Sequence, residues 1–424
     1  MSNIYEMFGD YMYKETFHNP KRAQKILCLA YEAFGLKSKV FPNKNLSKAN
    51  QYLANVTMDA IVKPFSHPEN SVLTSIFFPS ELIHAFGLDP LCAEQFSAYI
   101  NGAKATRAFR EIAEGAGIAE TYCSYHKILM GASLVGVLPK PTCIVNTSII
   151  CDANNLTFRQ VAQDENVPHY YVDVPFEKSE TSVQYVTKQL EDLIPWLEEK
   201  TGRKLDWNVL KQNLVRSKET IDTIKETYTY RKNRYVPNDL TSELFQALAI
   251  NTALGTPGAL KFAQMLLEEY KQAPKSHARK IVWMHTNPQW QQPLKDIFNY
   301  SQDWQVIATD MCFATLDIEI DPEKPLESLA RRMVYNAYNG HAQDRIQATA
   351  DMVKKLDADG VICFCHWGCK ETCGASAMIK NNLEAQGIPT LILNGDGVDP
   401  ANSSDGQIQT RVEAFLEMLE DHAA

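Results

Sequence analysis

The sequence lacks the features that would place it on a nucleic acid or in a membrane. It has no block of basic residues, and 51 acidic against 42 basic side chains give a formal net charge of -9. This balance argues against a nucleic-acid-binding surface, where a positive patch supplies most of the affinity. No run of about 18 apolar residues is present to span a bilayer. We therefore expect no nucleic-acid partner and no membrane partner.

The N-terminal stretch also lacks the pattern of a signal peptide. It reads MSNIYEMFGDYMYKETF, with acids and aromatics in place of basic residues followed by an apolar run. We therefore expect a cytoplasmic protein. In a reducing compartment, the ten cysteines are expected to be buried thiols, metal ligands or redox groups rather than disulfides.

Several catalytic motifs are missing as well. There is no C-x-x-C for thiol–disulfide exchange, no G-x-S-x-G nucleophile elbow and no G-x-G-x-x-G dinucleotide turn. Cys365, Cys369 and Cys373 have the spacing C-x3-C-x3-C. The radical-SAM pattern needs a last spacing of two residues, and zinc knuckles need tighter pairs. A metal site made from this run alone is therefore disfavoured.

What the chain does contain is strand–helix alternation in two separate regions. Residues 71–88 form a β-branched and aromatic run, then a turn and a helix with Ser80 as its N-cap. Strands are expected at 143–150, 167–175, 280–286, 304–312, 361–364 and 390–393. Residues 180–271 are purely helical in pattern. Alternation of this kind is typical of parallel sheets covered by helices.

We therefore predict an α/β fold with two doubly wound parallel-sheet domains, a helical N-terminal segment and a central helical insert. The predicted division is an N-terminal helical segment over 1–60, a first α/β domain over 61–176, a helical insert over 177–275 and a second α/β domain over 276–424.

Three thiols fall at predicted strand ends or turns in separate parts of the chain. Cys123 precedes a helical turn, Cys151 ends a strand, and the third is one of Cys365, Cys369 and Cys373. Soft thiolates at the carboxyl end of a strand are where an open α/β sheet would hold an iron–sulfur cluster. From spacing alone the third thiol stays open, and buried core thiols in a cluster-free α/β protein remain the alternative.

Four stretches carry a resemblance to a known family. They are FFPSELIHAFGL, YCSYHKILMG, SIICDANN, and the block DGVICFCHWGCK, LEAQGIPTLILNGD and GQIQTRVEAFLEML. Over residues 72–175 and 278–420 the chain resembles the 2-hydroxyacyl-CoA dehydratase/benzoyl-CoA reductase family, D-component. The last block is the most specific in order and spacing.

The resemblance implies two related subunits, each holding a [4Fe–4S] cluster by three cysteines from different domains. The matching positions are Cys123, Cys151 and Cys369. Cys365 and Cys373 have no matching role, and Cys365 remains an alternative to Cys369. Three thiolates on four irons would leave one iron open to a substrate oxygen.

The resemblance also implies a reaction and its partners. An ATP-hydrolysing iron–sulfur activator would supply one electron to an (R)-2-hydroxyacyl-CoA, and the resulting ketyl radical would eliminate water. Glu81, at a helix start, would assist proton transfer; its structural reading is a favourable pairing with the helix dipole. Lys127 and Arg411 are either contacts to CoA phosphates or salt-bridged charges. Alternatives are a benzoyl-CoA reductase-type subunit and a non-catalytic electron-relay subunit.

Overall fold

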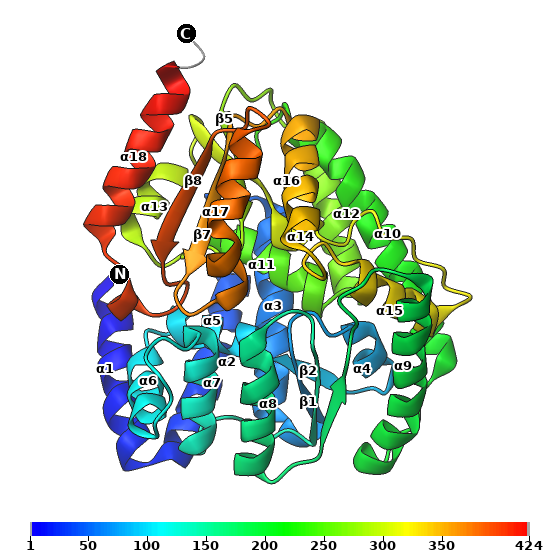
Figure 1. Ribbon diagram of the computed structural model, residues 1–424. Coiled ribbons are helices and arrows are strands. Elements are labelled where there is room, and N and C mark those ends of the chain that lie inside the picture. Colours follow the sequence, from blue (N-terminus) through cyan, green and yellow to red (C-terminus); the bar gives the residue numbers. More distant parts are fainter. Residues whose placement is uncertain (1, 422–424) are drawn as a thin grey trace.

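Two parallel sheets of four strands form the centre of the molecule (Figure 1). The computed structural model describes residues 2–421. The first sheet has the strand order β2-β1-β3-β4 and the second has the order β6-β5-β7-β8. The strands are β1 Ser71–Thr74, β2 Asp89–Cys92, β3 Cys143–Thr147, β4 His169–Val172, β5 Arg279–Met284, β6 Trp304–Thr309, β7 Gly360–His366 and β8 Thr390–Gly395. The predicted α/β fold with two parallel-sheet domains is confirmed.

Helices precede, separate and cover the sheets. The N-terminal group is α1 Ser2–His18, α2 Pro20–Val40 and α3 Lys48–Ser66. The first sheet region contains α4 Ser80–Ala85, α5 Ala93–Gly102, α6 Thr106–Gly115, α7 Ser124–Leu134 and α8 Asp152–Glu165, and the insert contains α9 Glu180–Thr201, α10 Trp207–Arg231, α11 Leu240–Thr252 and α12 Pro257–Gln272. The second sheet region contains α13 Gln292–Phe298, α14 Asp310–Phe313, α15 Pro325–Tyr335, α16 Ala342–Leu356, α17 Lys370–Glu384 and α18 Asp405–Asp421. Two 3-10 turns are η1 Pro68–Asn70 and η2 Pro400–Asn402.

The predicted boundaries at 60, 176 and 275 stay predictions. The two sheets and the four insert helices lie within the predicted ranges, whereas α3 continues past residue 60 to Ser66.

Strand β7 shows why these sheets are parallel and buried. Every residue of GVICFCH is buried, so the strand has no polar face. An unbroken apolar run of this kind fits a strand covered by helices on both sides rather than one with a solvated face. Its neighbours β5 and β8 both run parallel to it.

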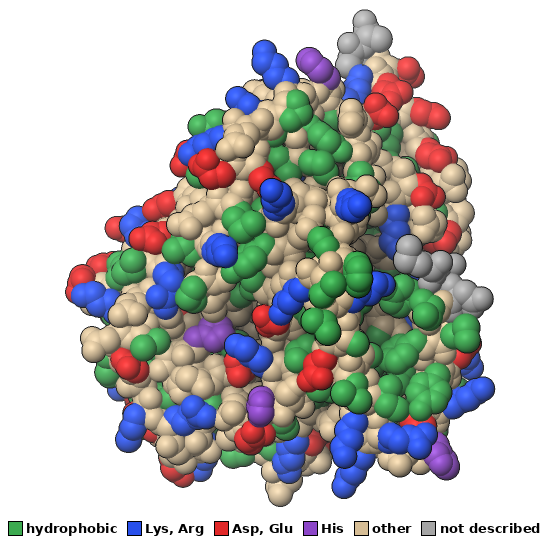
Figure 2. Space-filling model, turned by 180° about the vertical axis from the view of Figure 1, so that it is seen from behind, with side chains coloured by type: hydrophobic (Ala, Val, Ile, Leu, Met, Phe, Trp, Pro, Cys, Tyr) green, Lys and Arg blue, Asp and Glu red, His purple; other side chains and the backbone are tan. Residues whose placement is uncertain are grey.

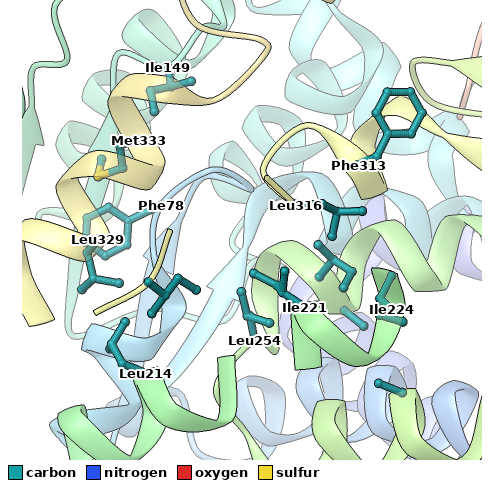
Figure 3. Packing of buried hydrophobic residues seen from close by; sticks show 14 of the residues in the cluster. Phe78, Ile149, Leu214, Ile221, Ile224, Leu254, Phe313, Leu316, Leu329 and Met333 are labelled. Atoms are coloured by element: carbon teal, nitrogen blue, oxygen red, sulfur yellow. The ribbon is translucent and has the colours of Figure 1, made fainter. Parts of the chain in front are cut away.

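One hydrophobic core joins the two sheets through the helical insert. It includes Val72 and Val145 from the first sheet and Val282 and Val361 from the second. Figure 3 shows part of this core, where Phe78, from the loop after β1, lies beside Leu329 and Met333 of α15. Side chains from the two halves of the chain therefore pack together, and the loop after β1 is held against a helix of the second half.

The surface carries charges of both signs. Seen from behind, Lys and Arg side chains alternate with Asp and Glu side chains, and hydrophobic side chains gather over α1 and α2 (Figure 2). Within residues 2–421, no helix combines the length and the apolar character that crossing a membrane requires.

Candidate functional site

Each of the three predicted cysteine ligands is the N-cap residue of a helix. Cys123 caps α7, Cys151 caps α8 and Cys369 caps α17. The first turn of a helix leaves backbone N–H groups without intrahelical partners, and the helix dipole places partial positive charge there. The helix start by itself favours the thiolate and makes cysteine a better ligand, but in the unliganded chain the effect of burial on the pKa is larger.

Cys151 and Cys369 occupy equivalent places in the two sheets. Cys151 follows β3 and Cys369 follows β7, and each of these strands lies third in sequence and beside the first strand of its sheet. The strand order reverses at this point, and the crevice outside the carboxyl ends there is where open α/β sheets bind ligands. In Figure 1, α17 of the second sheet stands above α7 and α8 of the first.

The turn before α17 is pressed against the start of α7. Gly368 has φ +79, and a Cβ atom on it would lie 2.6 Å from the backbone nitrogen of Cys123 and from the carbonyl carbon of Tyr122. Only a glycine allows this approach. The Tyr122 hydroxyl donates to the Ala153 carbonyl oxygen at 2.8 Å, which ties the start of α7 to the first turn of α8. The three helix starts therefore meet.

The three thiols also act on one another electrostatically. Burial raises the pKa of Cys123 well above its usual value, and the nearby Cys151 and Cys369 thiols raise it further. Burial, with a contribution from the Glu371 carboxylate, raises the pKa of Cys369 to about 11. Without a ligand these thiols are protonated. A bound metal group would displace those protons, because only the thiolate is a metal ligand.

Cys365 belongs to a different group of thiols. The pKa of Cys365 is raised first by its contact with Cys363, and its other thiol neighbour is Cys373. Cys123 and Cys151 are not among the groups that act most strongly on that pKa, whereas Cys369 raises the pKa of both. The structure therefore brings Cys369, not Cys365, to the other two predicted ligands.

A buried ion network holds Cys369 in place. The Arg345 guanidinium donates to both Glu371 oxygens at 3.1 and 3.0 Å, in the first turn of α17. It also donates to Asp310 at 2.7 Å, and Asp310 accepts the backbone N–H of His285 at 2.7 Å. Sequence reasoning missed Arg345, because its hydrogen-bond partners Asp310 and Glu371 lie in two other segments of the chain.

Each thiol faces one histidine. The Sγ–Nε2 distances are 3.3 Å for Cys123 and His366, 3.5 Å for Cys151 and His126, and 3.6 Å for Cys369 and His285. Burial lowers the pKa of His126 to about 3 and lowers the pKa of the other two as well, so all three rings are neutral. Sequence reasoning gave these histidines no role, although His126 and His366 each lie three residues from a predicted ligand.

Glu81 lies in a buried ion pair. Its two oxygens accept from the Arg332 guanidinium of α15 at 2.5 and 2.6 Å, and one also accepts from the Ser217 hydroxyl at 2.8 Å. Burial opposes ionisation, but the Arg332 charge and hydrogen bonds outweigh it and hold the pKa of Glu81 below its ordinary value. A carboxylate with both oxygens engaged in this way is built to join α4 to α15 and α10 rather than to take up a proton.

A second carboxyl, Glu94 in the first turn of α5, lies close enough to Cys151 to raise the pKa of that thiol. It accepts from the Ile76 backbone N–H at 3.0 Å and from the Cys92 thiol at 3.3 Å. Burial nevertheless raises the pKa of Glu94 to about 7. Sequence reasoning missed Glu94, because the short strand β2 that precedes it was not predicted either.

Lys127 and Arg411 are both engaged with the protein. Lys127 is buried, and its Nζ donates to a Glu114 oxygen at 2.7 Å and to the Glu120 carbonyl at 2.8 Å. Arg411 donates to the Ile392 carbonyl at 2.8 Å. A contact of either residue with CoA stays a prediction.

The donor set suits an iron–sulfur group. Three cysteine sulfurs at helix N-termini are soft ligands of the kind that iron–sulfur clusters use. No group of three or more His, Cys, Asp or Glu side chains within residues 2–421 is spaced to hold a single metal ion. One surface hollow lies between the loop after β1 and α15, bordered by Phe77 and Arg332, and another is bordered by Arg231 and Glu243. None of the three cysteines lines either hollow.

Comparison with known proteins gives consistent results. Residues 75–419 match the family model described as 2-hydroxyglutaryl-CoA dehydratase, D-component. The chain is 22% identical over 366 residues to the (R)-phenyllactyl-CoA dehydratase alpha subunit of Clostridium sporogenes, covering 81% of this chain and 88% of that protein. It is 23% identical over 389 residues to the lactoyl-CoA dehydratase subunit alpha of Anaerotignum propionicum, covering 82% and 90%. It is 21% identical over 341 residues to a benzoyl-CoA reductase subunit of Thauera aromatica, covering 73% and 79%.

Proposed function

Because the chain belongs to the 2-hydroxyglutaryl-CoA dehydratase D-component family, we propose that it is a subunit of an iron–sulfur-dependent (R)-2-hydroxyacyl-CoA dehydratase. The observation that carries the proposal is the meeting of three cysteine N-caps from two sheet regions, at Cys123, Cys151 and Cys369. These residues would hold a [4Fe–4S] cluster. When bound, a cluster with three thiolates supplies one-electron chemistry and one iron without a protein ligand.

The proposed reaction removes water from a 2-hydroxyacyl thioester. The proton on the β-carbon is not acidic in the ground state, and one-electron reduction of the substrate to a ketyl radical solves this problem. The ketyl expels the hydroxyl, the β-proton becomes acidic, and the electron is recovered at the end of the cycle. An ATP-dependent iron–sulfur activator would supply the first electron, and a second related subunit would complete the enzyme, in line with the alpha-subunit names of the relatives.

Glu94 is the carboxyl best suited to move the β-proton. A proton-transfer group works best when its pKa is close to the working pH, and the pKa of Glu94 is about 7. Its Oε2 is held by Ile76 and Cys92, so the carboxyl has a defined orientation beside Cys151. Glu81, which the sequence had assigned to this step, has both oxygens bound to Arg332. A catalytic role for Glu81 stays a prediction.

Electron stoichiometry tests the proposal. The purified complex is assayed without oxygen, with the activator, ATP and an (R)-2-hydroxyacyl-CoA, while the electron donor and the enoyl product are both measured. A dehydratase forms many product molecules for each electron supplied. Consumption of two electrons for each product would instead indicate the reductase reaction of the Thauera aromatica relative.

A cluster that only relays electrons is distinguished by its response to substrate. Three protein ligands leave an iron that a substrate oxygen can reach, so adding acyl-CoA should change the EPR spectrum of the reduced cluster. An unchanged spectrum at saturating acyl-CoA, with the iron content intact, would support the relay role.

A further inference from the structure

The three imidazoles that face the three thiols share one geometry. In each pair the nitrogen nearest the sulfur is Nε2, at 3.3, 3.5 and 3.6 Å for His366, His126 and His285. The three histidines come from β7, from α7 and from the position directly after β5. A separate segment thus supplies one ring to each sulfur.

The proton position on His366 follows from its other nitrogen. The backbone N–H of Gly397 donates to Nδ1 at 3.0 Å, so Nδ1 carries no proton. The Asp396 oxygen 3.6 Å from Nδ1 already accepts the N–H groups of Val398 and Asp399. The ring proton is therefore on Nε2, which points at the Cys123 sulfur, and His366 is the hydrogen-bond donor of that pair.

The other two rings differ from His366 in their second neighbour. Within residues 2–421, Nδ1 of His126 is buried without a hydrogen-bond partner, so the Cys151 thiol is the one partner of that ring. The ring of His285 lies near the Phe364 carbonyl as well as the Cys369 thiol, and that carbonyl is a second acceptor for a ring N–H. His285 also has a left-handed backbone, with φ +74, held by the bond from its N–H to Asp310. A residue with a Cβ atom rarely adopts this conformation, and such strain persists where the surroundings enforce it.

We propose that His366 and His126 are positioning residues that donate Nε2–H to the thiolates of Cys123 and Cys151 and raise the reduction potential of the bound cluster. The inference rests on the proposed function. A donor to a ligand sulfur stabilises the more negative, reduced state of the cluster more than the oxidised state, and hydrogen bonds to sulfur are among the factors that set these potentials. These two histidines would lower the driving force that the activator must supply.

Redox titration of His366 variants tests the proposal. The enzyme is purified without oxygen, and the EPR signal of the reduced cluster is followed against potential. His366→Leu removes the donor, so the midpoint should move to a more negative potential. His366→Gln keeps an N–H group, so its midpoint potential should lie close to the wild-type value. His169→Gln is the control, because this half-buried ring bonds to Asn146 at 2.7 Å instead of to a cysteine.

Isotope labelling gives a readout that needs no stable His366→Leu variant. Histidine labelled with ¹⁵N in the ring is incorporated, and pulsed EPR of the reduced cluster should detect a ¹⁵N coupling. His366→Gln should lose part of that coupling. Equal midpoints in all variants, or no ring coupling in a cluster of normal iron content, would overturn the role of the histidines. Absence of iron from the wild type would instead refute the proposed function.

Discussion

The two sheets have the same strand order but use the loop after the first strand differently. In the second sheet, β5 is followed by His285, whose ring faces Cys369 beyond β7. In the first sheet, β1 is followed by the loop to α4 and Glu81, which pairs with Arg332. The loop after the third strand carries a cysteine N-cap in both. The shared strand order therefore provides one cysteine position in each sheet. The loop after β5 places a histidine beside the cysteines, whereas the loop after β1 leads to a residue that binds a helix of the second sheet region.

Removing one thiol at a time tests the equivalence of the two sheets and has the largest expected effect. Cys369→Ser and Cys151→Ser should each lose the cluster, because two thiolates cannot replace three. Cys365→Ser is the matched control and should retain iron, since Cys365 contacts Cys363 and Cys373 instead. Iron and sulfide per chain are measured after anaerobic purification. Loss of iron in Cys365→Ser with retention in Cys369→Ser would reverse the assignment.

The second prediction separates the two carboxyls of the first sheet region. Glu94→Gln should lower the rate by about 100-fold or more, because general acid–base catalysis contributes about that factor. The wild-type pH profile of kcat/KM should show an ionisation near pH 7, below which Glu94 is protonated and above which it can act as a base. The ionisation near pH 7 should be absent from the kcat/KM profile of Glu94→Gln and present in that of Glu81→Gln. If the ionisation near pH 7 is still present in Glu94→Gln, a different group transfers the proton.

The third prediction concerns the ion pair of Glu81 with Arg332. Glu81 follows the first strand of its sheet, as His285 follows the first strand of the other. Glu81→Gln should lower the free energy of unfolding by about 3 to 5 kcal/mol, because it leaves the buried Arg332 charge without its partner. Urea denaturation at pH 7 measures the loss. The control is Glu180→Gln, which breaks the exposed ion pair between Glu180 and Arg331, the residue before Arg332. This change should lower the free energy of unfolding much less.

The pH dependence of that loss has a definite sign. Arg332 depresses the pKa of Glu81 in the folded state, so the stabilisation is present above the unfolded pKa of about 4.3 and is lost as the pH falls through the folded value. The difference between wild type and Glu81→Gln should therefore be constant near neutrality and shrink only in acid. A difference that shrinks between pH 6 and pH 8 would contradict the ion pair.

The fourth prediction concerns the contact between Gly368, in the turn before α17, and Cys123 at the start of α7. It has the smallest expected effect. Gly368→Ala places a Cβ atom 2.6 Å from the Cys123 nitrogen and forces an alanine into φ +79, which should cost about 1 to 3 kcal/mol and reduce iron retention. Gly374→Ala, in α17, is the matched control because a Cβ atom there meets nothing within 4 Å. Thermal unfolding and iron content measure both. Equal behaviour of the two variants would show that the turn does not press on α7.

Much of the fold could be predicted from local pattern. The apolar runs of β3, β7 and β8, the N-terminal helices and the helices of 180–272 are visible in the sequence pattern. Strand β2, DPLC, was missed because it has four residues and a proline, which is tolerated since β2 is an edge strand. Ser80 was predicted as an N-cap but is the first residue of α4, after Pro79.

The site was only partly visible in the sequence, for a physical reason. The three cysteine positions came from a family resemblance together with their places at strand ends and helix starts. The partners of these residues could not be predicted, because each contact joins distant segments: Arg332 with Glu81, Gly368 with Cys123, and His285 with Cys369. Nothing local in the sequence distinguishes such a histidine or arginine from one on the surface.

The central claim is that Cys123, Cys151 and Cys369 together hold one inorganic cluster. Iron and acid-labile sulfide, measured in the wild-type chain after purification without oxygen, test it most directly. The account predicts about four irons and about four sulfides for each chain. A fully folded chain that contains neither would contradict it.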